Sequence, residues 1–182
     1  MERALLTVEM PILLGEKKKL VLSQGWHGPY HGRICSPMEL DHAVDIATPV
    51  GTIVQAARAG VVRGLSMASN RFSRDLDLSP ADIDRWTRYC TNWILLEHGD
   101  GIQTLYAHLM SESQCVETGQ RVRAGEHLAR TGLSGWVGDI DNLHFQVQEW
   151  RGRNVTLPFR FAGYKGPMEH ADLFPSPSSS VA

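Results

Sequence analysis

The chain has 182 residues, of which 42% are apolar and 21% are charged, so it is long enough for one globular domain with a buried core. Its net charge of −2 gives no reason to expect a nucleic acid or an anionic membrane surface as a partner. No apolar run approaches the roughly 18 residues of a membrane span. The N-terminus also lacks the order of a secretory signal, because its lysines follow its apolar residues.

The N-terminal part is predicted to contain two strands, at residues 5–9 and 20–23. Residues 24–39 follow, and they are rich in glycine, proline and histidine without any regular period, which is typical of a loop. Loops often carry functional residues, so His27, Tyr30 and His31 are candidates. Residues 44–62 then predict three short strands separated by turns.

A polar, irregular stretch at residues 66–79 leads into a predicted helix. Ser79 is a good helix N-cap and Pro80 suits the first helical turn, and apolar side chains recur at helical spacing as far as Cys90. We therefore interpret residues 66–90 as an insertion between strands.

The second half predicts more strands. Asp100-Gly101 separates two strand-like runs, as in a β-hairpin, and His98 beside this turn is expected to be solvent-exposed. Short units rich in valine and glycine follow at residues 116–132. Residues 142–150 form the clearest remaining strand, and residues 155–167 are expected to add an edge segment.

Alternation of side chains along strands restricts which residues can share a site. In residues 142–150, His144 shares a polar face with Asn142 and lies opposite the apolar face. His42 and Asp45 are an odd number of residues apart, so a regular strand would point them to opposite faces. By the same reasoning, His108 is expected on the face of Tyr106.

The cysteines argue against one kind of metal site. Cys35, Cys90 and Cys115 form no Cys-x-x-Cys pair, so a cysteine-based zinc site is not expected. Their spacing leaves open whether two of them form a disulfide. A catalytic zinc site would instead need three histidine or carboxylate ligands and an open position for water, together with a proton-transfer group.

Four blocks in order resemble the lysostaphin/LytM type of zinc metalloendopeptidase. They are HAVDIATPVGTIVQAARAGVV, NWILLEHGDGIQTLYAHL, VETGQRVRAGEHLARTGLSG and NLHFQV, and they span roughly residues 25–150. The resemblance implies an all-β fold, with a compact antiparallel sheet that carries a groove. Residues 66–90 are expected to form one short helical insertion in this fold. It implies one peptidase domain over residues 1–174, and the tail at 175–182 is expected to be disordered.

The resemblance also implies a role for individual residues. The metal ligands fall on Asp45 and His144, and the catalytic histidine of the Tyr-x-His-Leu block falls on His108. The first metal histidine of the family usually lies four residues before the aspartate, where this chain has Asp41. A branch of the family places it in an upstream loop, which points to His31 as the third ligand of Zn²⁺. Asp41 and His42 remain the alternatives, and no other cofactor is implied.

One departure from the family concerns Asn142, which stands where the family usually has the first histidine of a His-x-His motif. Asparagine can donate a hydrogen bond to an oxyanion but cannot transfer a proton near neutral pH. The resemblance implies an endopeptidase that cleaves bacterial peptidoglycan peptides, in the periplasm or outside the cell, although no signal peptide is recognised. The alternatives are a catalytically impaired module that binds cell-wall peptide or regulates a partner hydrolase, and a carrier-type β module without metal.

Overall fold

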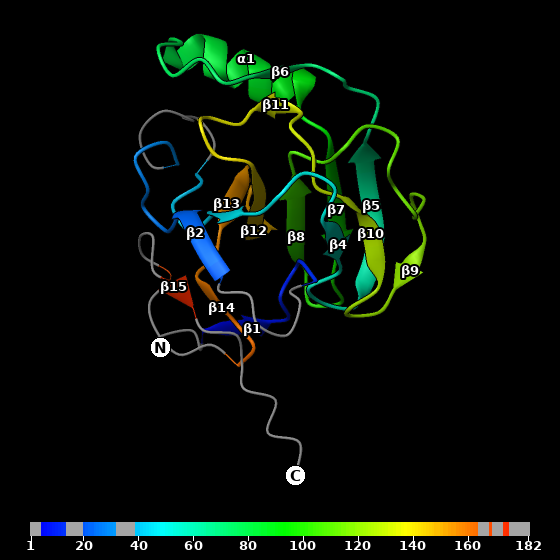
Figure 1. Cartoon of the computed structure of the whole chain (residues 1–182). Coiled ribbons are helices and arrows are strands. Elements are labelled where there is room, and N and C mark those ends of the chain that lie inside the picture. Colours follow the sequence, from blue (N-terminus) through cyan, green and yellow to red (C-terminus); the bar gives the residue numbers. More distant parts are fainter. Residues whose placement is uncertain (1–4, 14–19, 32–38, 164–167, 169–172, 175–182) are drawn as a thin grey trace.

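The computed structural model describes residues 5–13, 20–31, 39–163, 168 and 173–174 (Figure 1). These residues form short strands and one helix. In chain order the elements are β1 (Leu6–Val8), β2 (Leu20–Gln24), β3 (Val44–Ala47), β4 (Ile53–Gln55), β5 (Gly60–Ser66), β6 (Phe72–Ser73), α1 (Pro80–Cys90), β7 (Trp93–Glu97), β8 (Ile102–Ala107), β9 (Arg121–Val122), β10 (His127–Arg130), β11 (Gly135–Trp136), β12 (Asn142–Trp150), β13 (Asn154–Thr156), β14 (Phe159–Phe161) and β15 (Leu173–Phe174). The predicted all-β class with one helical insertion is confirmed.

A nine-stranded sheet forms the body of the molecule. Its strand order is β15-β2-β3-β12-β8-β7-β5-β9, with β13 paired to β12, and neighbouring strands run antiparallel. Three two-stranded pairs lie beside it; the β4–β10 pair is antiparallel, whereas the β1–β14 and β6–β11 pairs are parallel. The central position of β12 between β3 and β8 brings segments far apart in sequence onto one sheet.

The two faces of β12 differ as the alternation predicted. Leu143, Phe145 and Val147 are fully buried in the hydrophobic core. His144 and Gln146 lie on the opposite face, where they line a groove. A strand whose polar side chains are all turned to one face can therefore carry a site without disrupting the core on the other face.

The C-terminal segment adds strands β13 and β14, which each pair with one other strand, as expected of an edge segment, and it also contributes to the core. Phe159 and Phe161 are fully buried and pack against Phe145. Their ring centroids lie 5.3 and 5.8 Å, respectively, from the ring centroid of Phe145. Through β14 they also pair with the N-terminal strand, in which Leu6 lies opposite Phe159. Their neighbours in space are remote in sequence, so local patterning could not reveal their burial.

The insertion forms a wall above one side of the sheet, at the top of the view in Figure 1. Helix α1 begins at Pro80, where the Ser79 side chain accepts a hydrogen bond from the backbone N–H of Asp82, as predicted. Ile83 packs with Trp136 and Leu40 in a small apolar cluster separate from the main core. This cluster fixes the helix beside the groove.

The remaining expectations have different outcomes. His98 is only 3% exposed, so its predicted exposure is wrong; its ring bonds Ala59 O at 2.8 Å and Thr104 Oγ1 at 3.1 Å. Cys90 and Cys115 are free thiols, whereas Cys35 and the tail at 175–182 lie outside the described residues. Within the described ranges, no helix is long and apolar enough to cross a membrane.

Candidate metal and catalytic site

One row of side chains crosses five strands of the sheet. Gln24 of β2 lies opposite Asp45 of β3, and Asp45 lies opposite His144 of β12. His144 in turn lies opposite Ala107 of β8, and Ala107 lies opposite Trp93 of β7. Because directly opposite residues in a sheet share a face, the register alone brings Asp45 and His144 together although 99 residues separate them.

The loop after β2 brings His31 to the same place. Its backbone amide donates to Gly28 O at 3.1 Å, and the amide of Tyr30 donates to Gln24 Oε1 at 3.0 Å. The other end of the same side-chain amide, Gln24 Nε2, donates to Asp45 Oδ2 at 3.0 Å. Gln24 therefore ties the histidine-bearing loop directly to the carboxylate.

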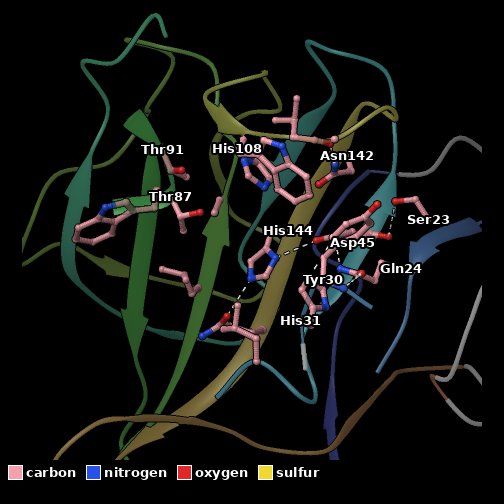
Figure 2. A pocket seen from close by; sticks show the side chains of 18 of the residues that line it. Ser23, Gln24, Tyr30, His31, Asp45, Thr87, Thr91, His108, Asn142 and His144 are labelled. Atoms are coloured by element: carbon pink, nitrogen blue, oxygen red, sulfur yellow. Dashed lines mark hydrogen bonds and ion pairs between the residues drawn. The ribbon is translucent and has the colours of Figure 1, made fainter. Parts of the chain in front are cut away.

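His31, Asp45 and His144 form a cluster in which one ligand atom from each side chain lies within 4.8 Å of the others (Figure 2). His31 Nε2 lies 3.3 Å from Asp45 Oδ2, and His144 Nδ1 lies 2.9 Å from Asp45 Oδ1. A tetrahedral zinc ion with bonds of about 2.0–2.2 Å requires ligand atoms roughly 3.3–3.6 Å apart. Two imidazole nitrogens and a carboxylate are also a donor set that suits zinc. The donor types therefore fit a zinc ion, and the 3.3 Å separation lies within that range, whereas the 2.9 Å separation is that of a hydrogen bond and would widen around a bound ion.

The protonation of His144 supports this fit. Its Nε2–H donates to Gln146 Oε1 at 2.9 Å, so in the neutral ring Nδ1 carries the lone pair and faces the Asp45 carboxylate. Two acceptors at this distance require a positive charge between them, which either a proton or a metal ion can supply.

Electrostatics keeps the carboxylate ionised. Burial alone would raise the pKa of Asp45, but the charge of His31 and hydrogen bonds with His144 and His31 outweigh it, so the pKa lies well below its ordinary value. Burial would likewise lower the pKa of His144, but its hydrogen bond to Asp45 and the charge of that carboxylate raise it.

The two alternative ligands lie elsewhere. Asp41 is exposed, and it is not part of the cluster. His42 precedes β3, where its Nδ1–H donates to Thr156 O at 3.3 Å and its ring lies against Trp26 and His27. Of the three candidates for the first ligand, the structure brings only His31 to Asp45 and His144.

His108 lines the same groove (Figure 2). It therefore lies on the groove side of the sheet and not on the face of Tyr106, where it was expected. Tyr106 points into the core, where burial raises its pKa to about 12, so the expectation that His108 shares its face is wrong. The reason is local: β8 ends at Ala107, and His108 has a φ of 62°, which breaks the alternation. Its ring centroid lies 6.0 Å from that of His144.

A backbone carbonyl fixes the tautomer of His108. Nδ1–H donates to Ser134 O at 2.8 Å, so Nε2 carries the lone pair in the neutral ring. Burial and the neighbouring His144 lower the pKa of His108 to about 4. The group is thus a neutral base beside the cluster.

Asn142 has no free donor. Its Nδ2 donates to Val137 O at 3.1 Å and to Ile140 O at 2.8 Å, which uses both amide hydrogens. Its Oδ1 is buried and has no hydrogen-bond partner among the described residues. In this arrangement Asn142 holds the loop that contains Val137 and Ile140, and it cannot also donate to an oxyanion.

The groove around the cluster has a volume of about 440 Å³. One end holds the His31, Asp45 and His144 side chains, and Figure 2 shows Thr87 and Thr91 on the opposite side. Gln146 and Gln148 also line it.

Sequence reasoning missed two residues that orient the cluster. Alternation along β12 placed Gln146 on the face of His144, and that signal could have identified it. Gln24 gave no such signal, because its place opposite Asp45 follows a register irregularity between β2 and β3.

The chain resembles known proteins both in sequence and in fold. The model of peptidase family M23 matches residues 39–157. The uncharacterized lipoprotein YgeR of Escherichia coli K12 is 27% identical over 127 residues, which are 68% of this chain and 42% of YgeR, so the chain spans less than half the length of that relative. The M23 metalloprotease pseudoalterin from the deep sea has a TM-score of 0.56 at 19% identity, covering 95% of this chain and 92% of pseudoalterin. Lysostaphin has a TM-score of 0.54 at 21% identity, covering 94% of this chain and 61% of lysostaphin.

Proposed function

Because this chain belongs to peptidase family M23, of the LytM type, we propose that it is a zinc endopeptidase that hydrolyses peptide bonds of bacterial peptidoglycan. The single observation that carries the proposal is the cluster of His31, Asp45 and His144 at one end of a groove, with His108 beside it. The likeness to lysostaphin and pseudoalterin supports the fold, and the side chains of this chain support the chemistry.

His31 Nε2, one Asp45 oxygen and His144 Nδ1 would hold the ion. When bound, zinc would supply the Lewis acidity that polarises a peptide carbonyl and activates water for attack. Gln146 orients His144 by accepting its Nε2–H, and Gln24 orients Asp45 by donating to Oδ2.

His108 is the proton-transfer group in this proposal. With Nδ1–H held by Ser134 O, Nε2 can take a proton from the attacking water and return it to the leaving amine. The donor role once expected for Asn142 is not proposed, because its amide hydrogens are engaged by Val137 O and Ile140 O.

Peptidoglycan as substrate places the protein in the cell envelope, in the periplasm or outside the cell. YgeR is named a lipoprotein, which is consistent with an envelope location for this chain too. We further propose that residues 1–174 form one unit, because β1 and β14 both close the core around Phe145.

Digestion of purified peptidoglycan by the zinc-loaded protein tests this function. We expect soluble peptide fragments with new amino termini from the wild type. His108→Ala should bind zinc as the wild type does but lose activity by about 10²–10⁴-fold. Stoichiometric zinc binding without release of fragments from several peptidoglycan types would exclude the enzyme.

The second candidate is a catalytically impaired module of the same fold that binds cell-wall peptide or regulates a partner hydrolase. Asn142 favours it, because an amide that cannot transfer a proton stands where the family usually has a histidine. Sedimentation with insoluble peptidoglycan, without cleavage, is the outcome that would favour this candidate.

A further inference from the structure

We propose that the groove contains a pocket for an uncharged aliphatic side chain of the bound peptide, between the metal cluster and helix α1. The inference rests on the proposed function and adds the class of side chain that the site accepts. It concerns the part of the groove formed by β7, β8 and α1, which the zinc chemistry does not use.

The sheet register forms the floor of this pocket. Ala107 lies beside His144, and Trp93 follows Ala107 on the next strand. In the adjacent row, Leu105 lies beside Gln146 and opposite Leu95. The small Ala107 side chain leaves space beside the metal ligand, and the larger apolar side chains surround that space.

This floor is not fully covered by the rest of the protein. Trp93, Leu95 and Leu105 are half-buried, whereas the apolar residues on the other face of the same strands, such as Ile94 and Leu96, are fully buried. All three line the groove. The sheet therefore retains open apolar surface beside the candidate catalytic centre, and covering such surface with an aliphatic group is favourable.

The wall formed by α1 provides little hydrogen bonding to a ligand. Thr87 Oγ1 donates to Ile83 O at 2.9 Å, and Thr91 Oγ1 donates to Trp86 O at 3.5 Å, so both hydroxyl protons are used within the helix. A polar side chain in the pocket would lose its water without gaining equivalent donors.

The charges that line the pocket also favour an uncharged side chain of the peptide. Among the residues of β7, β8 and α1 that line the groove, the charged one is Arg88, and its Nε donates to both Asp84 oxygens at 2.8 and 2.7 Å; Asp139, which also lines the groove, is exposed in the loop between β11 and β12. A lysine or glutamate side chain that enters between β7, β8 and α1 would therefore meet no free counter-charge on these elements, which is more costly than burying an aliphatic chain.

The test uses blocked pentapeptides, acetyl-Gly-Gly-Xaa-Gly-Gly-amide, in which Xaa is Gly, Ala, Leu, Glu or Lys. Binding to the zinc-loaded wild type is measured by NMR titration, and cleavage is mapped by mass spectrometry. We expect the Leu peptide to bind at least about 10-fold more tightly than the Gly peptide, and the Glu and Lys peptides no more tightly than Gly.

Two variants and a matched control test whether the preference for the Leu peptide arises in this pocket. Thr87→Trp should fill the pocket and remove the preference for Leu, whereas Tyr89→Trp on the exposed side of the same helix should preserve it. Leu95→Asp should shift the preference from the Leu peptide to the Lys peptide. This second variant tests the pocket independently, because its result does not depend on how the indole ring of Thr87→Trp packs. Zinc content and circular dichroism verify that each variant is folded.

The outcomes separate this inference from the proposed function. Preferential binding of Leu without cleavage supports the pocket and contradicts the enzyme. Cleavage with equal affinity for all five peptides, or a preference that survives both Thr87→Trp and Leu95→Asp, overturns the pocket and preserves the enzyme. Absence of binding by every peptide overturns the pocket.

Discussion

Gln146 Oε1 accepts the Nε2–H of His144 at 2.9 Å, and Gln146 lies two residues after His144 in the same strand. The side chain of Gln146 in turn donates to Gln148 Oε1, and Gln148 Nε2 donates to Gln103 Oε1 at 3.0 Å. Each amide orients the previous one, so the oxygen of Gln146 is the end that faces the histidine. The row therefore sets both the tautomer and the ring orientation of a proposed metal ligand.

The first prediction follows from that row. Gln146→Leu should weaken zinc binding by about 10- to 100-fold, because His144 loses the acceptor that fixes its tautomer. Gln146→Glu keeps an acceptor oxygen and should restore most of the affinity. Competition with a chromophoric chelator measures the dissociation constants. Gln103→Leu, at the far end of the row, is the control; equal effects of Gln103→Leu and Gln146→Leu would contradict a specific role for Gln146.

The second prediction concerns the choice of ligands. His31→Ala should abolish stoichiometric zinc binding, whereas His42→Ala, in the segment just before β3, should retain it. At zinc concentrations about 100 times the dissociation constant, binding stabilises a folded protein by about 2.7 kcal/mol. The zinc-induced rise in Tm should therefore disappear in His31→Ala and persist in His42→Ala. The reverse result would restore His42 as the ligand.

The third prediction separates two roles of Asn142. Asn142→Ala should destabilise the fold by about 1–3 kcal/mol, because Val137 O and Ile140 O lose their donor. Urea denaturation measures this change. Asn142→Asp also lacks the amide hydrogens and should be similarly destabilised. If both variants have wild-type stability but reduced peptidoglycan cleavage, Asn142 acts in the reaction and does not anchor the loop.

The fourth prediction uses the buried His98. Burial lowers the pKa of His98 below the ordinary value of 6.5, and the nearby charge of Arg58 lowers it further. The hydrogen bond to Ala59 O and the charges of Asp100 and Glu97 raise it, but these effects are smaller than that of burial. On acidification the unfolded chain therefore binds a proton before the folded chain does. The stability is complete above about pH 6.5 and falls as the pH drops below it.

Denaturation between pH 7.5 and 5 measures that contribution. His42 and His108 also have lowered pKa values and act in the same direction, so the wild type has to be compared with a variant. In His98→Gln the free energy of unfolding should fall less steeply over this interval. An identical slope in both proteins would show that His98 does not titrate differently in the two states.

The fifth prediction tests whether the C-terminal segment belongs to the folding unit. Phe159→Ala should cost about 3–5 kcal/mol, since the fully buried ring contacts Phe145, Phe161 and Trp26. Phe72→Ala, at a ring that is half exposed, should cost much less. A wild-type Tm in Phe159→Ala would mean that β14 is not part of the cooperative core.

The sequence by itself determined the features that depend on neighbouring residues. Alternation from Asn142 to Gln148 placed the polar side chains of β12 on one face, and the Ser79-Pro80 cap predicted where α1 begins. The same reasoning set His42 apart from Asp45. Each inference needs only the period of two in a strand or the hydrogen-bonding needs of the first helical turn.

Only the tertiary structure decided the features that depend on strand order and backbone departures. The register across β2, β3 and β12 brings Gln24 to Asp45 and His144, and the positive φ of His108 turns its ring away from Tyr106. The burial of Phe159 likewise depends on its pairing with β1. These features are contacts between distant segments, and a local period of two or 3.6 residues contains no information about which segments meet.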